Sequence, residues 1–238
     1  MSIKMKRQWL LALPTLGLLC GMAQADQAPK AMACVYLINT SSTQKLADTD
    51  VEYHTTPWYF WRSDNRVETR SAHGETGEVW ESSPRGQISY TKLFHPAEKA
   101  IDYTPGDLSA LAINTDWDQI KSIIDPKLLG TQLKRTGEQT VDGQRAERYA
   151  GKVDDTNTEV LWLPEMKLPA RIEKTRGGVM VSLRMAECKP LASAPWTMTS
   201  DTQMQSYQHL DYADLGDMEN DPFVKKVTDH NEGLHHGH

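Results

Sequence analysis

Residues 137–188, GEQTVDGQRAERYAGKVDDTNTEVLWLPEMKLPARIEKTRGGVMVSLRMAEC, carry the clearest structural signal in this chain of 238 residues. Five short segments with strand-like composition or alternation follow one another, at 140–143, 148–151, 160–164, 168–173 and 179–183. Gly177 and Gly178 form a two-residue hairpin signal before the last segment. The stretch therefore predicts a run of antiparallel strands.

The first half of the chain continues this pattern. Strand signals fall at 34–38, 51–55, 58–61, 66–71, 77–80, 87–90 and 97–104, which predicts a long meandering sheet. In the fourth of these segments Arg66, Glu68 and Arg70 alternate with smaller residues. That period of two is typical of a strand whose charged face meets water.

Two short helices interrupt the predicted meander. Residues 105–112 place Leu108 and Leu111 on one face, and residues 115–124 do the same for Trp117 and Ile120. Because each helix has one apolar face, we expect both helices to lie on the concave face of the sheet. The sequence thus favours a mainly β fold of the α+β class.

Residues 1–25 have the features of a secretory signal peptide. Basic residues precede an apolar run at 10–19, and Ala-Gln-Ala at 23–25 is a small-x-small cleavage pattern. Cys20 leaves lipoprotein processing open as an alternative, but a leucine stands before it, where that processing requires a small residue. We therefore expect export and cleavage after Ala25.

The charge argues against polyanionic partners. Residues 1–25 contain three basic and no acidic residues, so their removal changes the formal net charge from −6 to −9. Phosphate backbones and anionic lipid surfaces select basic proteins instead. No nucleic-acid partner is expected.

Two cysteines remain after that cleavage, Cys34 and Cys188. In an oxidising compartment such a pair is most simply one disulfide. A redox or metal-binding thiol pair is the alternative, but the C-x-x-C spacing is missing.

The sequence contains no recognisable catalytic apparatus. It has no G-x-S-x-G, no H-E-x-x-H and no glycine-rich phosphate loop, and its carboxylates are scattered. His54, His73 and His95 have no marked nucleophile beside them. We therefore expect a non-enzymatic protein.

Aromatic residues gather in the first half of the chain, and two readings of them stay open. In a closed core they provide packing, whereas in a curved and unclosed sheet they line a cavity for an apolar ligand. The residues expected to form the wall and lid of such a cavity are Trp58, Phe60, Trp80, Tyr90, Phe94 and Trp162, with Leu111, Trp117 and Ile120 as the lid.

Residues 190–238 are expected to form a linker and a peripheral tail that is acidic and histidine-rich. Ser200 and Gln203 indicate a capped helix. The tract at the end provides imidazole ligands suited to zinc or copper, at His230, His235, His236 and His238. A solvated tail without metal is the alternative, and no other cofactor is predicted.

Several short motifs resemble the periplasmic lipoprotein-carrier superfamily (LolA/LolB-like), which includes RseB/MucB-type sensors. They are Val141-Asp142-Gly143 leading to Tyr149, the run at 161–164, and the Leu-Pro-Ala-Arg entry at 168–171. The resemblance covers roughly residues 53–187. It implies an incomplete antiparallel β-barrel with short helices covering the concave face, and a cavity that accepts acyl chains.

These expectations define three parts: a signal peptide at 1–25, a half-barrel domain at 26–189 and the tail at 190–238. The function expected first is the binding of a lipid or lipoprotein acyl chain in the periplasm, for carriage or sensing. One alternative is a metal-handling or partner-docking accessory protein that acts through the tail. Another is an envelope-stress sensor with an envelope protein partner.

Overall fold

The computed structural model describes residues 31–42, 55–71 and 73–227. The expected signal peptide, most of the strand expected at 51–55 and the histidine tract lie outside these residues. The strands are β1 (Met32–Ser42), β2 (Thr55–Arg62), β3 (Arg66–Arg70), β4 (Thr76–Ser82), β5 (Ile88–Phe94), β6 (Lys99–Tyr103), β7 (Leu133–Val141), β8 (Gln144–Val153), β9 (Thr156–Leu163), β10 (Leu168–Arg176), β11 (Val179–Pro190) and β12 (Gln208–Asp211). The helices are α1 (Pro105–Ala110), α2 (Trp117–Ser122) and α3 (Asp201–Ser206), with 3-10 turns η1 (His95–Ala97), η2 (Pro126–Leu128), η3 (Leu191–Ser193) and η4 (Tyr212–Met218), and residues 222–227 are also helical.

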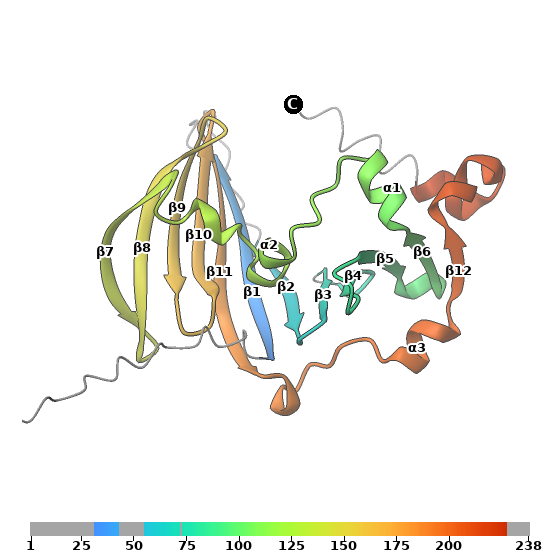
Figure 1. The fold of residues 1–238 in the computed structure, drawn as a ribbon, viewed down its shortest axis with the longest axis horizontal. Coiled ribbons are helices and arrows are strands. Elements are labelled where there is room, and N and C mark those ends of the chain that lie inside the picture. The colour runs from blue at the N-terminus through green and yellow to red at the C-terminus, as the bar shows by residue number, and fades with distance from the viewer. Residues whose placement is uncertain (1–30, 43–54, 72, 228–238) are drawn as a thin grey trace, which may run out of the picture.

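All these strands belong to one sheet, in the order β12-β6-β5-β4-β3-β2-β1-β11-β10-β9-β8-β7. Neighbouring strands are antiparallel except for β12, which runs parallel to β6. Within the described residues the end strands β7 and β12 do not pair with each other, so the sheet is open. Figure 1 shows the sheet curled, with β7–β11 on one side and β5, β6 and β12 on the other. The expected mainly β fold with an unclosed barrel is confirmed.

Turn chemistry accounts for the hairpins of the second half. Gly177 and Gly178 have φ of +58° and +80°, which is the conformation of the tight turn predicted between β10 and β11. Asp142 and Gly143 also have positive φ and form the turn between β7 and β8. The strand expected at 140–143 therefore ends at Val141, because an Asp-Gly pair favours a turn.

The two predicted helices are present and shorter than expected. At α1 the side chain of Thr104 accepts from the N–H of Asp107, in a capping box. At α2 the cap is Asp116, whose carboxylate accepts from the N–H groups of Asp118 and Gln119, so the helix starts later than residue 115. No helix among the described residues is long and apolar enough to cross a membrane.

The register of the sheet defines two faces. Five residues lie opposite one another on the successive strands β2 to β6 and therefore share a face: Arg62, Val67, Trp80, Tyr90 and Tyr103. We call it the inner face because both helices cover it. α1 packs on its β5–β6 part, and α2 lies across its middle, as expected (Figure 1). The opposite face is called the outer face.

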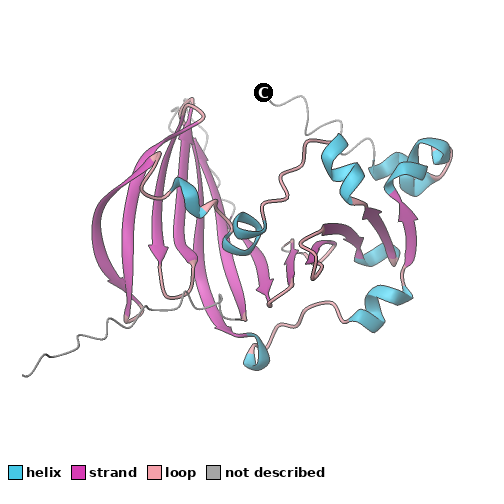
Figure 2. Cartoon of the chain, in the orientation of Figure 1, coloured by secondary structure: helices cyan, strands magenta, loops and turns pink. Residues whose placement is uncertain are grey.

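The segment after β11 is part of the fold, which differs from the peripheral tail expected at 190–238. Figure 2 shows its first part as a loop that runs from η3 to α3. β12 then adds to the edge of the sheet, and Leu210, Leu215 and Val224 are buried. The helix predicted from Ser200 is confirmed, since this side chain accepts from the N–H of Gln203. A four-residue strand is too short to stand out from the sequence alone.

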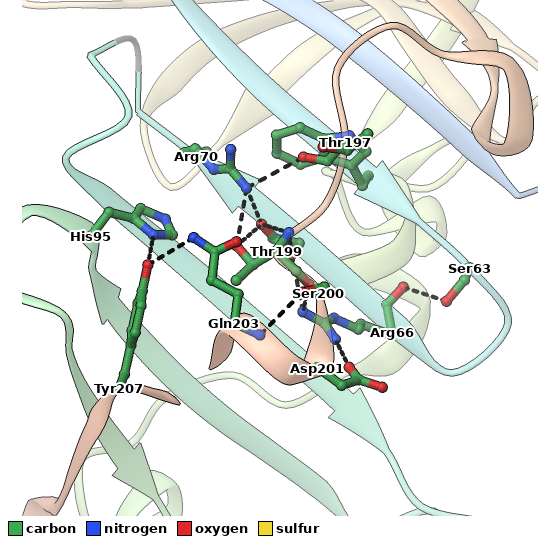
Figure 3. A network of polar contacts seen from close by, with 12 residues as sticks. Ser63, Arg66, Arg70, His95, Thr197, Thr199, Ser200, Asp201, Gln203 and Tyr207 are labelled. Carbon is green, nitrogen blue, oxygen red and sulfur yellow. Dashed lines mark hydrogen bonds and ion pairs between the residues drawn. The ribbon is translucent and has the colours of Figure 1, made fainter. Parts of the chain in front are cut away.

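The charged face of β3 is dry, contrary to the wet face expected for it. Glu68 is fully buried, and its carboxylate accepts from the guanidinium groups of Arg66 (3.1 Å) and Arg70 (2.8 Å). The N–H and Oγ1 of Thr199 also donate to Glu68, and Arg66 pairs with Asp201 at 2.7 Å. Figure 3 shows how these side chains converge on the crossing loop. This cluster is called the clasp, because it fastens the C-terminal segment to the outer face.

The expected disulfide is confirmed. Cys34 on β1 and Cys188 on β11 are bonded, and they are direct partners in the register of these two strands. The bridge closes a separation of 154 residues. It therefore joins β1, the first described strand of the chain, to β11, the last strand of the stretch 137–188.

Candidate ligand-binding face

Buried apolar residues form three clusters that touch one another, and each cluster has members on the inner face. The central cluster contains Tyr36 and Phe60, the cluster at the β12 end contains Tyr90 and Tyr103, and the cluster at the β8 end contains Val160 and Ile172. Trp80 packs against the central and β12-end clusters, and Ile123 and Leu183 pack against the central and β8-end clusters. The apolar surface is therefore continuous along the sheet.

Arg62 fixes the helix that lies over this surface. Its side chain is fully buried on the inner face and donates to the carbonyl oxygen of Lys121 (2.9 Å), in the last turn of α2. It also donates to the carbonyl oxygens of Met166 (2.8 Å) and Lys167 (3.3 Å), in the turn between β9 and β10. Carbonyl groups at a helix C-terminus lack partners within the helix and carry partial negative charge, so a guanidinium suits this position.

The charge of Arg62 persists at neutral pH. Burial lowers the pKa of its guanidinium to about 10, and the electrostatic effect of Tyr36 acts in the opposite direction. Burial also raises the pKa of the Tyr36 hydroxyl above its usual range, which keeps this group neutral and able to donate to the carbonyl of Pro169. Both side chains thus anchor the β9–β10 turn beneath the helix.

A cavity of about 370 Å³ lies beneath the chain that follows α2. Its apolar wall comes from Ile123, Ile124 and Leu128 above and from Val153 and Ile172 on the sheet. Polar groups complete its lining, at Asn114, Gln119, Asp125, Gln132, Asp154, Thr158 and Lys174. The cavity is therefore of mixed character, with an apolar wall and a polar wall, and its volume lies within the range of small-molecule sites.

Gly151 on β8 permits the close approach that forms one wall of this cavity. A Cβ atom at this position would collide with the carbonyl oxygen of Gln132, which lines the cavity. The same atom would lie 3.2 Å from the Cα of Leu133. Glycine is therefore required where residues 132–133 pass over the strand.

The nine residues predicted to line a ligand cavity fall into separate groups. Phe60 belongs to the central cluster, and Trp58, Trp80, Trp117 and Ile120 pack against it. The remaining residues lie elsewhere: Tyr90 and Phe94 in or against the β12-end cluster, Trp162 in the β8-end cluster, and Leu111 outside all three, at 41% exposure.

Eight of the nine thus lie in or against the apolar clusters, and none of the nine lines the cavity beneath residues 123–128. The apolar residues that line this cavity were not predicted from the sequence, because they are single isoleucine, leucine and valine residues without a distinctive pattern. Arg62 was missed as well. The one signal that could have found it is its position at the end of an aromatic strand, on the same face as Trp58 and Phe60.

The predicted metal ligands His230, His235, His236 and His238 lie outside the described residues. Within the described ranges no group of three or more histidine, cysteine or acidic residues is placed to hold a metal ion. The zinc or copper site at the histidine tract stays a prediction.

Comparisons with known proteins found similarity only among solved structures. No family model matches the chain, and no curated protein matches it. One matching structure is PNGF-II, with a TM-score of 0.42 and 11% identity over 79% of this chain and 32% of that one. Another is the MucA/MucB complex of Pseudomonas aeruginosa, with a TM-score of 0.36 and 14% identity over 78% of this chain and 59% of that one.

A third match is a DUF1329 family protein from Desulfovibrio piger, with a TM-score of 0.34 and 9% identity over 75% of this chain and 91% of that one. The chain thus spans about a third of the PNGF-II structure and under two thirds of the MucA/MucB match.

Proposed function

We propose that this protein binds the acyl chain of a lipid or lipoprotein on its inner face, beneath the chain that follows α2. The observation that carries the proposal is the cavity between residues 123–128 and the sheet, whose apolar wall is contiguous with the central and β8-end clusters through Ile123. An acyl chain is long, flexible and apolar. It therefore fits a groove lined by aliphatic side chains better than a rigid polar molecule would.

The polar groups of the cavity favour an amphiphile over a pure hydrocarbon. Asn114 and Gln119 are hydrogen-bonded to each other at 2.8 Å, and Lys174 and Asp154 provide opposite charges in the same lining. A headgroup can meet these side chains while its chain contacts Ile124 and Ile172. Each methylene removed from water contributes about 0.8 kcal/mol, so ten methylenes contribute about 8 kcal/mol, which offsets much of the cost of association.

The proposed setting is the periplasm, and the proposed work is carriage or sensing without catalysis. The signal-peptide pattern at 1–25 and the Cys34–Cys188 disulfide support an exported protein. A bound chain that is later handed to, or detected by, an envelope protein would explain a cavity roofed by a short helix. Metal handling through the histidine tract is a separate possibility that rests on sequence alone.

Filling the cavity tests the proposal. Val153 lines the cavity and is half-buried, so Val153→Trp should occupy the space and reduce the affinity for a dansylated undecanoic acid at least about tenfold. The matched control is Leu37→Trp, which adds the same side chain at a half-buried position on the opposite face of β1 from Tyr36. The measurement is a fluorescence titration of the full-length protein.

Equal affinity of the two variants and the unmodified protein would contradict this location. Failure of the unmodified protein to bind the probe, together with no lipid in extracts of protein purified from envelopes, would contradict the function.

A further inference from the structure

The β12-end cluster of the inner face is covered by the protein itself. Tyr90, Ile101 and Tyr103 lie on the inner face of β5 and β6, and residues 212–227 pack against them. Tyr212 stacks on Tyr103 with ring centroids 4.6 Å apart, and Val224 is 2% exposed. Residues 212–227 are called the cover.

The surface beneath the cover continues the one that we propose for ligand binding. Trp80 stacks on Tyr90 at 4.3 Å between ring centroids and also packs against the central cluster. A chain lying along the central cluster would therefore reach Tyr90 directly after Trp80. In this structure the cover occupies the surface next to Tyr90.

A second cavity lies at the same end of the sheet. It has a volume of about 390 Å³ and is lined by Ile88, Pro105, Ser109, Ile113 and Thr115 among others, but by no residue of the cover. Ile113 also packs against the β12-end cluster, and Ile88 lies two residues before Tyr90 on the same strand and therefore on the same face. The cavity thus adjoins the surface that the cover occupies.

The two ends of the C-terminal segment are attached in different ways. The clasp holds its start through directional bonds, in which the N–H of Thr199 donates to both carboxylate oxygens of Glu68 at 3.0 and 3.1 Å. Arg66 donates to the carbonyl of Thr199 at 2.9 Å. An apolar ligand offers no donor or acceptor that could replace these bonds.

The cover is attached by contacts that an apolar ligand can replace. Phe223 meets Phe94 edge to face at 5.0 Å between ring centroids, and Val224 and Val227 pack beside them. Asp221 forms a part-exposed ion pair with Lys99 at 3.7 Å. Apolar burial is non-directional, so acyl methylenes can take the place of these side chains on Tyr90 and Tyr103.

We infer that residues 212–227 are a displaceable cover that competes with the ligand for the β12 end of the inner face, while the clasp keeps the segment attached. This inference rests on the proposed function, because the competitor is the same acyl chain. A ligand that needs the whole surface must displace the cover. Its observed affinity is therefore the intrinsic affinity multiplied by the fraction of molecules in which the cover is open.

Hydrogen exchange of the full-length protein tests the inference. With saturating dansylated undecanoic acid, amides in 212–227 should exchange at least about threefold faster, while those in 196–201 keep their rates. Unchanged or slower exchange in 212–227, in a protein that binds the probe, would overturn the inference and leave the proposed function intact.

A point variant provides a second and independent readout. Asp221 caps the last helical turn, accepting from the N–H of Phe223 at 2.7 Å, and also pairs with Lys99. Asp221→Ala should loosen the cover and tighten binding of the probe about threefold to tenfold. The control is Asp64→Ala, at an exposed position in the β2–β3 turn, which should leave the affinity unchanged.

Weaker or equal binding by a folded Asp221→Ala protein would contradict the inference. If neither the unmodified protein nor the variants bind the probe, the proposed function fails, and the inference fails with it.

Discussion

Adjacent strands β2 and β3 bury arginine side chains on opposite faces of the sheet and use them differently. On the inner face Arg62 donates to backbone carbonyls of α2 and of the β9–β10 turn. On the outer face Arg66 and Arg70 share the carboxylate of Glu68 with Thr199. Both arrangements join segments that are far apart in sequence: Arg62 bonds to residues 59 and 104 positions away, and Glu68 bonds to a residue 131 positions away.

The two arrangements differ in the groups that join the segments, and we expect them to differ in how readily each attachment is released. In the clasp a buried carboxylate faces two guanidinium groups, so loss of any partner leaves buried charge behind. Arg62 holds α2 through carbonyl groups, which can bond to water when the helix moves. We therefore expect a permanent attachment on the outer face and a releasable one beneath the ligand-binding face.

Substitution in the clasp should have the largest effect. Glu68→Gln removes the negative charge between Arg66 and Arg70, so we expect a loss of about 3–5 kcal/mol in the free energy of unfolding. The measurement is denaturant unfolding at pH 7. The matched control Glu138→Gln breaks the exposed ion pairs with Arg135 and Arg145 and should cost less than about 1 kcal/mol. Similar losses for both variants would refute the permanent attachment.

Substitution of Arg62 should reduce the free energy of unfolding less than substitution of Glu68 does, but it should change the rate of ligand dissociation more. Arg62→Gln keeps a shorter polar side chain but loses the charge-assisted bonds to α2, at a cost of about 1.5–3 kcal/mol. Because the helix is then less firmly held, the bound probe should dissociate faster in a stopped-flow competition experiment. A stability loss without any change in the dissociation rate would mean that α2 is a fixed part of the core.

The smallest effect concerns His209 on β12, at the edge that joins the clasp to the cover. Nδ1 lies 2.6 Å from Asp102 Oδ2, and Nε2 lies 2.9 Å from the carbonyl oxygen of Met204. Burial alone would lower the pKa of this imidazole, but the bond to Met204 and the bond and charge of Asp102 together raise it above the usual value.

The protonated form of His209 is thus favoured by folding. Its contribution to stability is complete below the unfolded pKa, about 6.5, and is lost as the pH rises through the higher folded value. Since the side chain is part-exposed, the effect on the free energy of unfolding should be below about 1 kcal/mol. Melting temperatures from pH 5 to 9 should show this loss, and His209→Gln should remove it. A variant with the same pH dependence would contradict the assignment.

The features that could be predicted from the sequence are those that depend on residues close together in the chain, such as turns, strands and short helices. Gly177-Gly178 specified a hairpin, and the apolar positions of 105–112 and 115–124 indicated two helices for the inner face. The alternation of Arg66, Glu68 and Arg70 located a strand, but the pattern is the same whether water or another segment covers the charges. A covering loop more than 120 residues away is not encoded locally.

The same limit applies to the candidate site. The aromatic residues predicted to line a ligand cavity lie in or against the buried apolar clusters, whereas the cavity depends on where residues 123–133 cross β8 and β10. That crossing requires Gly151 on one strand and is favoured by Arg62 on another. No neighbour of Gly151 in sequence reveals its role, and Arg62 is marked only by its position at the end of an aromatic strand.

The most direct test of the central claim is photo-crosslinking of the full-length protein with a diazirine-bearing fatty acid, followed by peptide mapping. We expect crosslinks on the inner face beneath the chain that follows α2, in peptides containing Ile123, Ile124, Val153 or Ile172. They should decrease in Val153→Trp and persist in Leu37→Trp. Crosslinks confined to outer-face positions, or none above the level of an unrelated protein, would contradict the central claim.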